Sequence, residues 1–144
     1  MLTNTLTAFN RMLDKNDLGK LLLRLTVGGL MLFHGMHKLL DGVGPIKGLL
    51  AAHGLPEFIA YGTLVGEVLA PLLIILGVLT RPAALVLAFT MVVAWLLVGF
   101  DKTWLLDKTG AWAIENIVYF FVAALAVAYL GAGRYSIASH PAWR

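Results

Sequence analysis

Residues 82–100 read PAALVLAFTMVVAWLLVGF, an unbroken apolar run without a charged side chain. A helix that crosses a membrane needs about 20 consecutive, predominantly apolar residues. Pro82 stands at the start of the run, and proline is favoured in the first turn of a helix. The run therefore predicts a transmembrane helix.

Similar apolar stretches lie on both sides of this run. Residues 58–79 precede it, and only Thr80 and Arg81 separate the two, so they must form a tight antiparallel hairpin. Residues 18–40 lie before this pair and residues 111–130 after it. The sequence thus predicts an all-α, polytopic membrane protein, a single membrane domain over residues 1–144 with a four-helix transmembrane bundle of spans 18–40, 58–79, 82–100 and 111–130.

A shorter segment precedes the first span. In residues 2–13, Leu6, Phe9 and Leu13 recur about once per helical turn. This spacing favours a short amphipathic helix on the membrane surface. A loosely ordered tail is the alternative. Residues 46–56 are too short to cross a membrane and are predicted to form a loop, with room for one helical turn.

The composition supports a membrane location. Of the 144 residues, 60% are hydrophobic and 13% are charged, against about 25% charged residues in soluble domains. A soluble globule of this size could not hide so much apolar surface, which excludes a disordered chain, a soluble enzyme domain and a nucleic-acid-binding module. The net charge of +3 is scattered along the chain, so no nucleic-acid partner is expected, and membrane lipid is the predicted surrounding.

The chain contains no cysteine. Disulfides, thiolate metal sites and iron–sulfur ligation by this chain are therefore excluded. Redox chemistry would need a borrowed cofactor. No spacing of histidines and carboxylates is specific enough to predict a metal site.

The basic residues near the span ends predict an orientation, because cytoplasmic loops carry an excess of Lys and Arg. One side of the membrane would carry six of them, and the other side would carry Lys38, Lys47, Lys102 and Lys108. The six are Arg11, Lys15, Lys20, Arg81, Arg134 and Arg144. Both termini are therefore predicted to be cytoplasmic.

Ionisable groups inside the spans mark a candidate site, because each costs several kcal/mol in the hydrocarbon layer (about 3 on insertion scales). Polar residues of three different spans should lie at similar depth in the outer half of the membrane. These are His34, His37 and Lys38 on one face of the first span, Glu67 in the second, and Glu115, Asn116 and Tyr119 at the start of the fourth. They are predicted to form one polar pocket.

Each group also has a simpler interpretation. Lys38 and Arg24 would extend their charged ends toward the two membrane surfaces. His34 would be a neutral histidine that only packs against a neighbouring helix. A carboxylate near mid-membrane is hardest to explain in this way, so Glu67 is the strongest candidate for a working role.

Several motifs resemble the DoxX family of small four-helix membrane proteins over about residues 18–137. The first block is Leu22-Leu23-Arg24-Leu25 followed by residues 33–39 (FHGMHKL), and the second is Gly66-Glu67-Val68 with residues 77–84 (GVLTRPAA). Glu115-Asn116 and residues 131–136 (GAGRYS) are similar to the third. The resemblance implies a bacterial cytoplasmic membrane and assigns the family's polar pattern to Arg24, His34, Gly35, Lys38, Glu67, Arg81, Glu115, Asn116 and Arg134. A paired-histidine metal or haem site is not implied, because the position of His37 is often glutamine in the family.

The family takes its name from a subunit of a thiosulfate:quinone oxidoreductase, so the resemblance implies a membrane subunit associated with redox chemistry. A quinone headgroup would be bound by the polar pocket, His34, His37, Lys38, Glu67, Glu115, Asn116 and Tyr119, with Arg24, Arg81 and Arg134 as structural polar residues. The alternatives are a non-catalytic membrane scaffold for a partner oxidoreductase and, less favoured, a proton or small-solute transporter. The sequence leaves open whether the chain is itself an enzyme subunit and whether it forms homo-oligomers.

Overall fold

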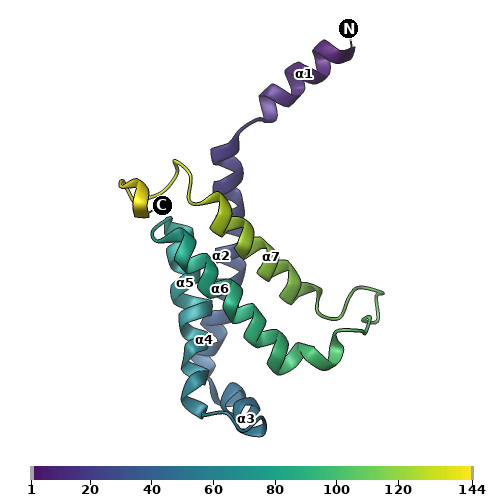
Figure 1. The fold of residues 1–144 in the computed structure, drawn as a ribbon, viewed down its shortest axis with the longest axis vertical. Helices are drawn as coiled ribbons and strands as arrows, with labels where there is room; N and C mark the ends of the chain where they lie inside the picture. Colours follow the sequence, from purple (N-terminus) through teal and green to yellow (C-terminus); the bar gives the residue numbers. More distant parts are fainter. Residues whose placement is uncertain (1, 144) are drawn as a thin grey trace.

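The structure is a computed structural model, and it describes residues 2–143. Met1 and Arg144, one of the six basic residues assigned to the cytoplasmic side, lie outside the described residues. The described chain begins with helices α1 (Leu2–Leu13), α2 (Asn16–Asp41) and α3 (Gly44–Ala52). Side chains of residues 3–13 in α1 are all exposed, and α1 projects away from the rest of the molecule (Figure 1).

The second span is a composite helix over Glu57–Leu76. It consists of η1 (Glu57–Tyr61), α4 (Gly62–Leu64), the π-helical turn η2 (Val65–Leu69) and α5 (Ala70–Leu76). The third span, Thr80–Lys102, consists of α6 (Thr80–Ala94), a second π-helical turn η3 (Trp95–Gly99) and η4 (Phe100–Lys102). The fourth is α7 (Glu115–Leu130), and a short turn η5 (Pro141–Trp143) lies near the C-terminus.

The chain is an all-α, polytopic membrane protein, as predicted. Among the described residues, three helices are long and apolar enough to cross a membrane, and α7 is a shorter apolar helix. The only β-type pairing in residues 2–143 is one isolated bridge between Leu106 and Trp112.

Three differences between the predicted and the observed elements have local reasons. The second span ends at Leu76, because Gly77 adopts the left-handed conformation (φ 76°) that ends many helices. The fourth begins at Glu115 rather than at Ala111, since residues 107–111 form a turn around the Asp107 carboxylate. Most of the predicted loop 46–56 is helical, in α3.

The helices run up and down the bundle. Both chain ends lie at one end of it, and α3 lies at the opposite end (Figure 1). We call these the terminal end and the α3 end. The core is formed by α2, α5, α6 and α7, in which Val27, Ile74, Leu87 and Val127 are fully buried. Small residues such as Ala84 fill the remaining contact surface and allow the helices to approach closely.

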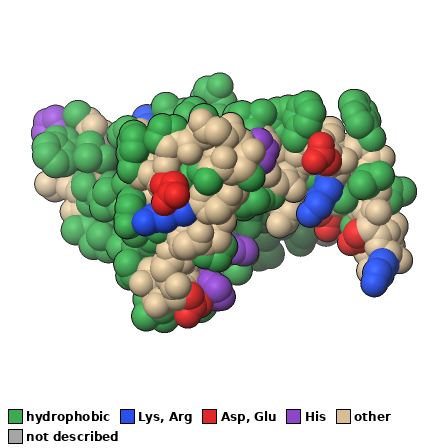
Figure 2. Space-filling view, turned by 90° about the horizontal axis from the view of Figure 1, so that it is seen from below, with side chains coloured by type: hydrophobic (Ala, Val, Ile, Leu, Met, Phe, Trp, Pro, Cys, Tyr) green, Lys and Arg blue, Asp and Glu red, His purple; other side chains and the backbone are tan. Residues whose placement is uncertain are grey.

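Large apolar side chains cover the outside of the bundle. Phe33, Phe89 and Tyr129 are each more than two-thirds exposed. Figure 2, a view from the α3 end, shows hydrophobic side chains over most of the surface and only scattered charged groups and histidines. This distribution suits a protein whose solvent is lipid rather than water.

Candidate functional site

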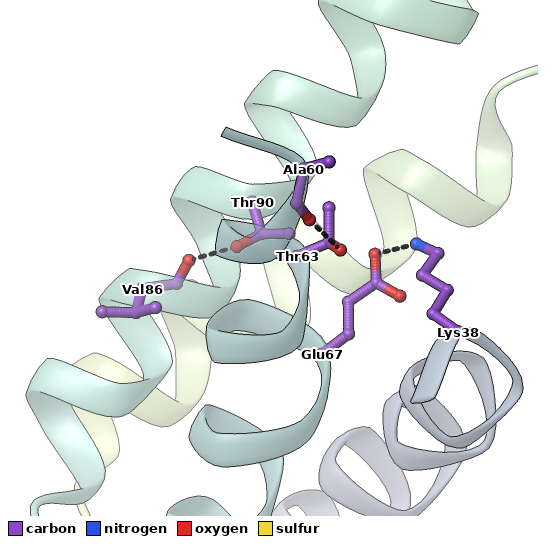
Figure 3. Close-up of polar contacts among 6 residues, drawn as sticks. All are labelled: Lys38, Ala60, Thr63, Glu67, Val86 and Thr90. Carbon is purple, nitrogen blue, oxygen red and sulfur yellow. Dashed lines mark hydrogen bonds and ion pairs between the residues drawn. The ribbon is translucent and has the colours of Figure 1, made fainter. Parts of the chain in front are cut away.

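The Glu67 carboxylate is the most deeply buried acidic group among residues 2–143. The residue is 4% exposed and lies in the π-helical turn η2. Its Oε1 accepts a hydrogen bond from the Lys38 ammonium of α2, and the two side chains point toward each other (Figure 3). This ion pair offsets part of the cost of placing a carboxylate in an apolar bundle.

Two glycines allow the backbones to meet at this point. A Cβ atom on Gly35 would lie 2.1 Å from the Glu67 carbonyl oxygen, so α2 rests directly on the backbone of η2. A Cβ atom on Gly66 would lie 1.9 Å from Thr90 Oγ1 of α6. Three helices therefore converge around Glu67, and only glycine fits at either contact.

The nearby hydroxyl groups do not bind the carboxylate. Thr63 Oγ1 donates to the Ala60 carbonyl oxygen at 2.7 Å, and Thr90 Oγ1 donates to the Val86 carbonyl oxygen at 2.9 Å (Figure 3). Each hydroxyl is thus used within its own helical segment. Glu67 Oε2 is buried, and it has no hydrogen-bond partner among residues 2–143.

Lys38 and Glu67 line a cavity of about 180 Å³, which we call the polar cavity. His34 and Asn116 are its other polar residues. The rest of the wall is apolar and consists of Met31, Met91, Ala94, Val98, Ile117 and Phe120. The His34 ring packs edge-on against the Phe120 ring, with 5.9 Å between centroids. The Asn116 side-chain oxygen accepts from the Ile117 amide at 2.8 Å, so its amide nitrogen is left as a donor.

The structure thus brings together four of the seven residues predicted to form one pocket. The other three are His37, Glu115 and Tyr119, and none of them lines the polar cavity. The His37 side chain is 77% exposed, and its Nε2 lies 3.2 Å from Asp41 Oδ2. Glu115 and Tyr119 line a separate, wider hollow, which shares Asn116 and Phe120 with the polar cavity.

Arg24 is a structural residue at the terminal end. It is 1% exposed, and its guanidinium donates to four backbone carbonyl oxygens at 2.6–2.8 Å. The acceptors are Ile74 and Ile75 of α5 and Ala132 and Tyr135 of the C-terminal segment. The Arg24 guanidinium is therefore bound within the protein rather than extended freely along the helix. It joins α2 to two other parts of the chain.

The other two predicted structural arginines make fewer contacts. Arg81 Nη1 donates to the carbonyl oxygens of Ala128 and Tyr129 at 2.7 and 2.9 Å, at the C-terminal end of α7. Arg134 is exposed, and its guanidinium lies 5.2 Å from the centre of the Tyr135 ring. Its backbone amide donates to Asp17 Oδ1 at 3.1 Å and so holds the C-terminal segment against α2.

The amino-acid sequence matches the model of a known protein family. The family model described as DoxX matches residues 19–99, more than half of the chain. The matched stretch includes nearly all of α2, the whole second span and most of the third, and therefore both Lys38 and Glu67. Searches of curated proteins and of solved structures gave no match.

Proposed function

Because the chain belongs to the DoxX family, we propose that it is a membrane subunit that binds a quinone headgroup in the polar cavity and serves a redox partner. One observation carries this proposal. Glu67 Oε2 is a buried acceptor without a hydrogen-bond partner in the described part of the chain, in a cavity that also contains three groups able to donate hydrogen bonds. An unpaired polar atom of this kind calls for a ligand or an ordered water.

The residues of the polar cavity fit such a headgroup. An oxidised quinone presents two carbonyl acceptors, for which Lys38, His34 and the Asn116 amide are donors. A reduced quinone presents hydroxyl donors, for which Glu67 Oε2 is an acceptor. Phe120 and the two methionines supply flat and adaptable apolar contacts for a ring. A few polar groups in a mostly apolar wall are typical of small-molecule sites.

A bound quinone would supply two-electron, two-proton redox chemistry. The part of this chain in that chemistry is to hold and move protons. Glu67 Oε2 would take a proton from a ligand hydroxyl as a reduced quinone is oxidised, and the Lys38 ammonium would compensate the carboxylate charge when that proton leaves. Because the chain has no cysteine, we assign the electrons to a partner oxidoreductase, which accepts them from the reduced quinone.

The test is Glu67→Gln, with Glu57→Gln as the matched control. Glu57 opens the same composite helix but is exposed. In the Glu67 variant, Lys38 loses its ionic partner and the charged acceptor is removed. We expect quinone binding to weaken about tenfold or more, the loss of about 1.4 kcal/mol or more, and the control to bind normally. Binding is measured as quenching of tryptophan fluorescence and as quinone retained after purification in mild detergent.

Equal affinity in the two variants would contradict the proposal. So would wild-type protein that neither retains nor binds quinone.

The scaffold alternative also has a structural basis. The same ion pair joins α2 to η2 and would hold the bundle in one geometry without any ligand. Under that alternative, Glu67→Gln lowers thermal stability and capture of the partner oxidoreductase, while wild-type protein binds no quinone. Transport of protons or small solutes predicts flux into liposomes that contain the pure protein.

A further inference from the structure

A second cavity of about 350 Å³ lies between the third span and α7, and we call it the apolar cavity. Among residues 2–143, Thr103 is the one residue in its wall that is not classed as hydrophobic. The other lining residues are Met91, Val92, Trp95, Trp112, Ile114, Ile117, Val118 and Phe121.

The polar groups in this wall are already bonded within the protein. Trp95 Nε1 donates to Thr103 Oγ1 at 2.9 Å, and Trp112 Nε1 donates to the Thr103 carbonyl oxygen at 2.7 Å. The Thr103 hydroxyl donates in turn to the Phe100 carbonyl oxygen at 2.7 Å. The two indole rings are thereby fixed as rigid apolar walls, and a polar ligand would find no free partner.

The two cavities are neighbours, because Met91 and Ile117 line both of them. The polar cavity alone is smaller than the roughly 300–1,000 Å³ of small-molecule sites, whereas the apolar cavity falls within that range. A ligand whose head occupies the polar cavity would therefore extend past Met91, an unbranched side chain that adapts easily to its neighbours. Val92, Val118 and Phe121 are only half-buried, so the apolar cavity reaches the lipid-facing side of the bundle.

We propose that the apolar cavity binds the first part of the isoprenoid tail of the quinone whose headgroup lies beside Glu67. This inference rests on the proposed function and extends it to the class of substrate, a quinone with a long hydrocarbon tail. The cavity wall excludes polar ligands, its position continues the headgroup site, and its open side faces the phase in which such quinones dissolve. Burying the tail there removes no hydrogen bond and gains dispersion contacts with two indole rings.

The test compares two ligands with the same headgroup, a tail-less benzoquinone and an analogue whose isoprenoid tail carries bromine. The protein carries Trp104→Phe and Trp143→Phe, which leaves Trp95 and Trp112 as its tryptophans. Bromine quenches indole fluorescence on contact, so quenching reports where the tail lies. Affinities for both ligands are measured by calorimetry. We expect the tailed ligand to bind about tenfold or more tightly than the tail-less one, from burial of several methylene groups, and to quench the remaining fluorescence.

Val118→Phe fills the apolar cavity from α7, and Val122→Phe is its control, one turn further along and 56% exposed. Val118→Phe should reduce the affinity for the tailed ligand to that of the tail-less ligand, and Val122→Phe should change neither affinity. Val92→Phe fills the cavity from α6 and gives a second variant if the first does not fold.

Three results would overturn the inference: no gain in affinity from the tail, equal effects of Val118→Phe and Val122→Phe, or displacement of the tail by ordinary phospholipid at similar concentration. Failure of the proposed function is distinguishable from these. In that case the tail-less quinone either does not bind or binds equally well to the Glu67→Gln variant.

Discussion

At the scale of single residues, the buried charges of this protein fall into two kinds. Arg24 has all of its contacts within the chain, because four backbone carbonyl oxygens accept from its guanidinium. Glu67 has one carboxylate oxygen paired and the other without a partner among residues 2–143. A fully satisfied buried charge is typical of a structural role, and a half-satisfied one is typical of a site that binds something.

Arg24→Lys should therefore destabilise the protein. Lysine keeps the charge but has no planar fork, so it cannot reach carbonyl oxygens on both α5 and the C-terminal segment. We expect a loss of about 3 kcal/mol, measured as reversible unfolding in mild detergent. Arg134→Lys, at an exposed position, should change stability by less than about 0.5 kcal/mol. Equal effects of the two variants would show that the Arg24 contacts contribute little.

The sequence predicted one pocket of seven residues, of which four line the polar cavity, and His37 shows why helical spacing alone groups too many residues. On a helix, Lys38 is turned by about 40° from His34 in one direction, and His37 by about 60° in the other. Spacing alone places all three on one broad face. The polar cavity lies toward His34 and Lys38, which leaves His37 outside it beside Asp41.

At the scale of helices, the contact between α2 and η2 depends on Gly35. Gly35→Ala would place a methyl group within 2.1 Å of the Glu67 carbonyl oxygen, which is backbone and cannot rotate away. The helices must then separate, which should cost about 2–3 kcal/mol and also weaken the Lys38–Glu67 pair. Gly29→Ala in the same helix is the control, because nothing lies within 4 Å of its added carbon. That variant should be neutral or stabilising by up to about 1 kcal/mol. Thermal unfolding of the two proteins in the same detergent checks this difference in sign.

The turn before α7 should respond to pH. The Thr109 hydroxyl and backbone amide both donate to Asp107 Oδ1 and hold the pKa of this carboxyl below its ordinary value of 3.8. Because the pKa is lower in the folded state, this contribution is fully present above pH 3.8 and is lost as the pH falls through the folded value. Hydrogen-exchange protection of the Thr109 and Ala111 amides should decline over that range. Asp107→Asn should remove the pH dependence, and wild-type protection that does not change with pH would contradict this account.

The helices themselves were predictable and their irregularities were not. The four apolar stretches predicted the four main helical segments because length and hydropathy suffice for that, and three of these segments in residues 2–143 are long enough to cross a membrane. The π-helical turns η2 and η3 leave no mark on an apolar sequence, although η2 contains Gly66, whose backbone lies close to Thr90. The start of α7 was predicted too early because Ala111, Trp112 and Ile114 are apolar, although the turn around Asp107 holds this segment outside the helix.

At the scale of the whole molecule, the fold places both termini at one end of the bundle (Figure 1). The absence of cysteine provides a clean background for testing which side of the membrane this is. In a bacterial cytoplasmic membrane, Lys108→Cys in the loop before α7 should react with a membrane-impermeant maleimide on intact cells. Asn4→Cys in α1 and Ala142→Cys near the C-terminus should react only after permeabilisation. The reverse pattern would contradict the prediction that both termini are cytoplasmic.

The apolar walls of the cavities are the part of the whole molecule that the sequence could not predict. Met91 and Phe120 line the polar cavity, yet an apolar side chain in a span looks the same in the sequence whether it faces lipid, core or cavity. Only the ionisable groups stand out against an apolar background, and the sequence prediction was accordingly limited to them.

The shortness of α7 has a consequence for the surrounding bilayer. Its 16 residues rise about 24 Å, whereas the hydrocarbon layer of a typical membrane is about 30 Å thick. The layer must thin locally around this helix, or the loop before it must dip below the headgroups. Either adjustment brings water closer to Asn116, at the start of α7, and to the Glu67 carboxylate in the same cavity. Protons would then have a shorter aqueous route to Glu67.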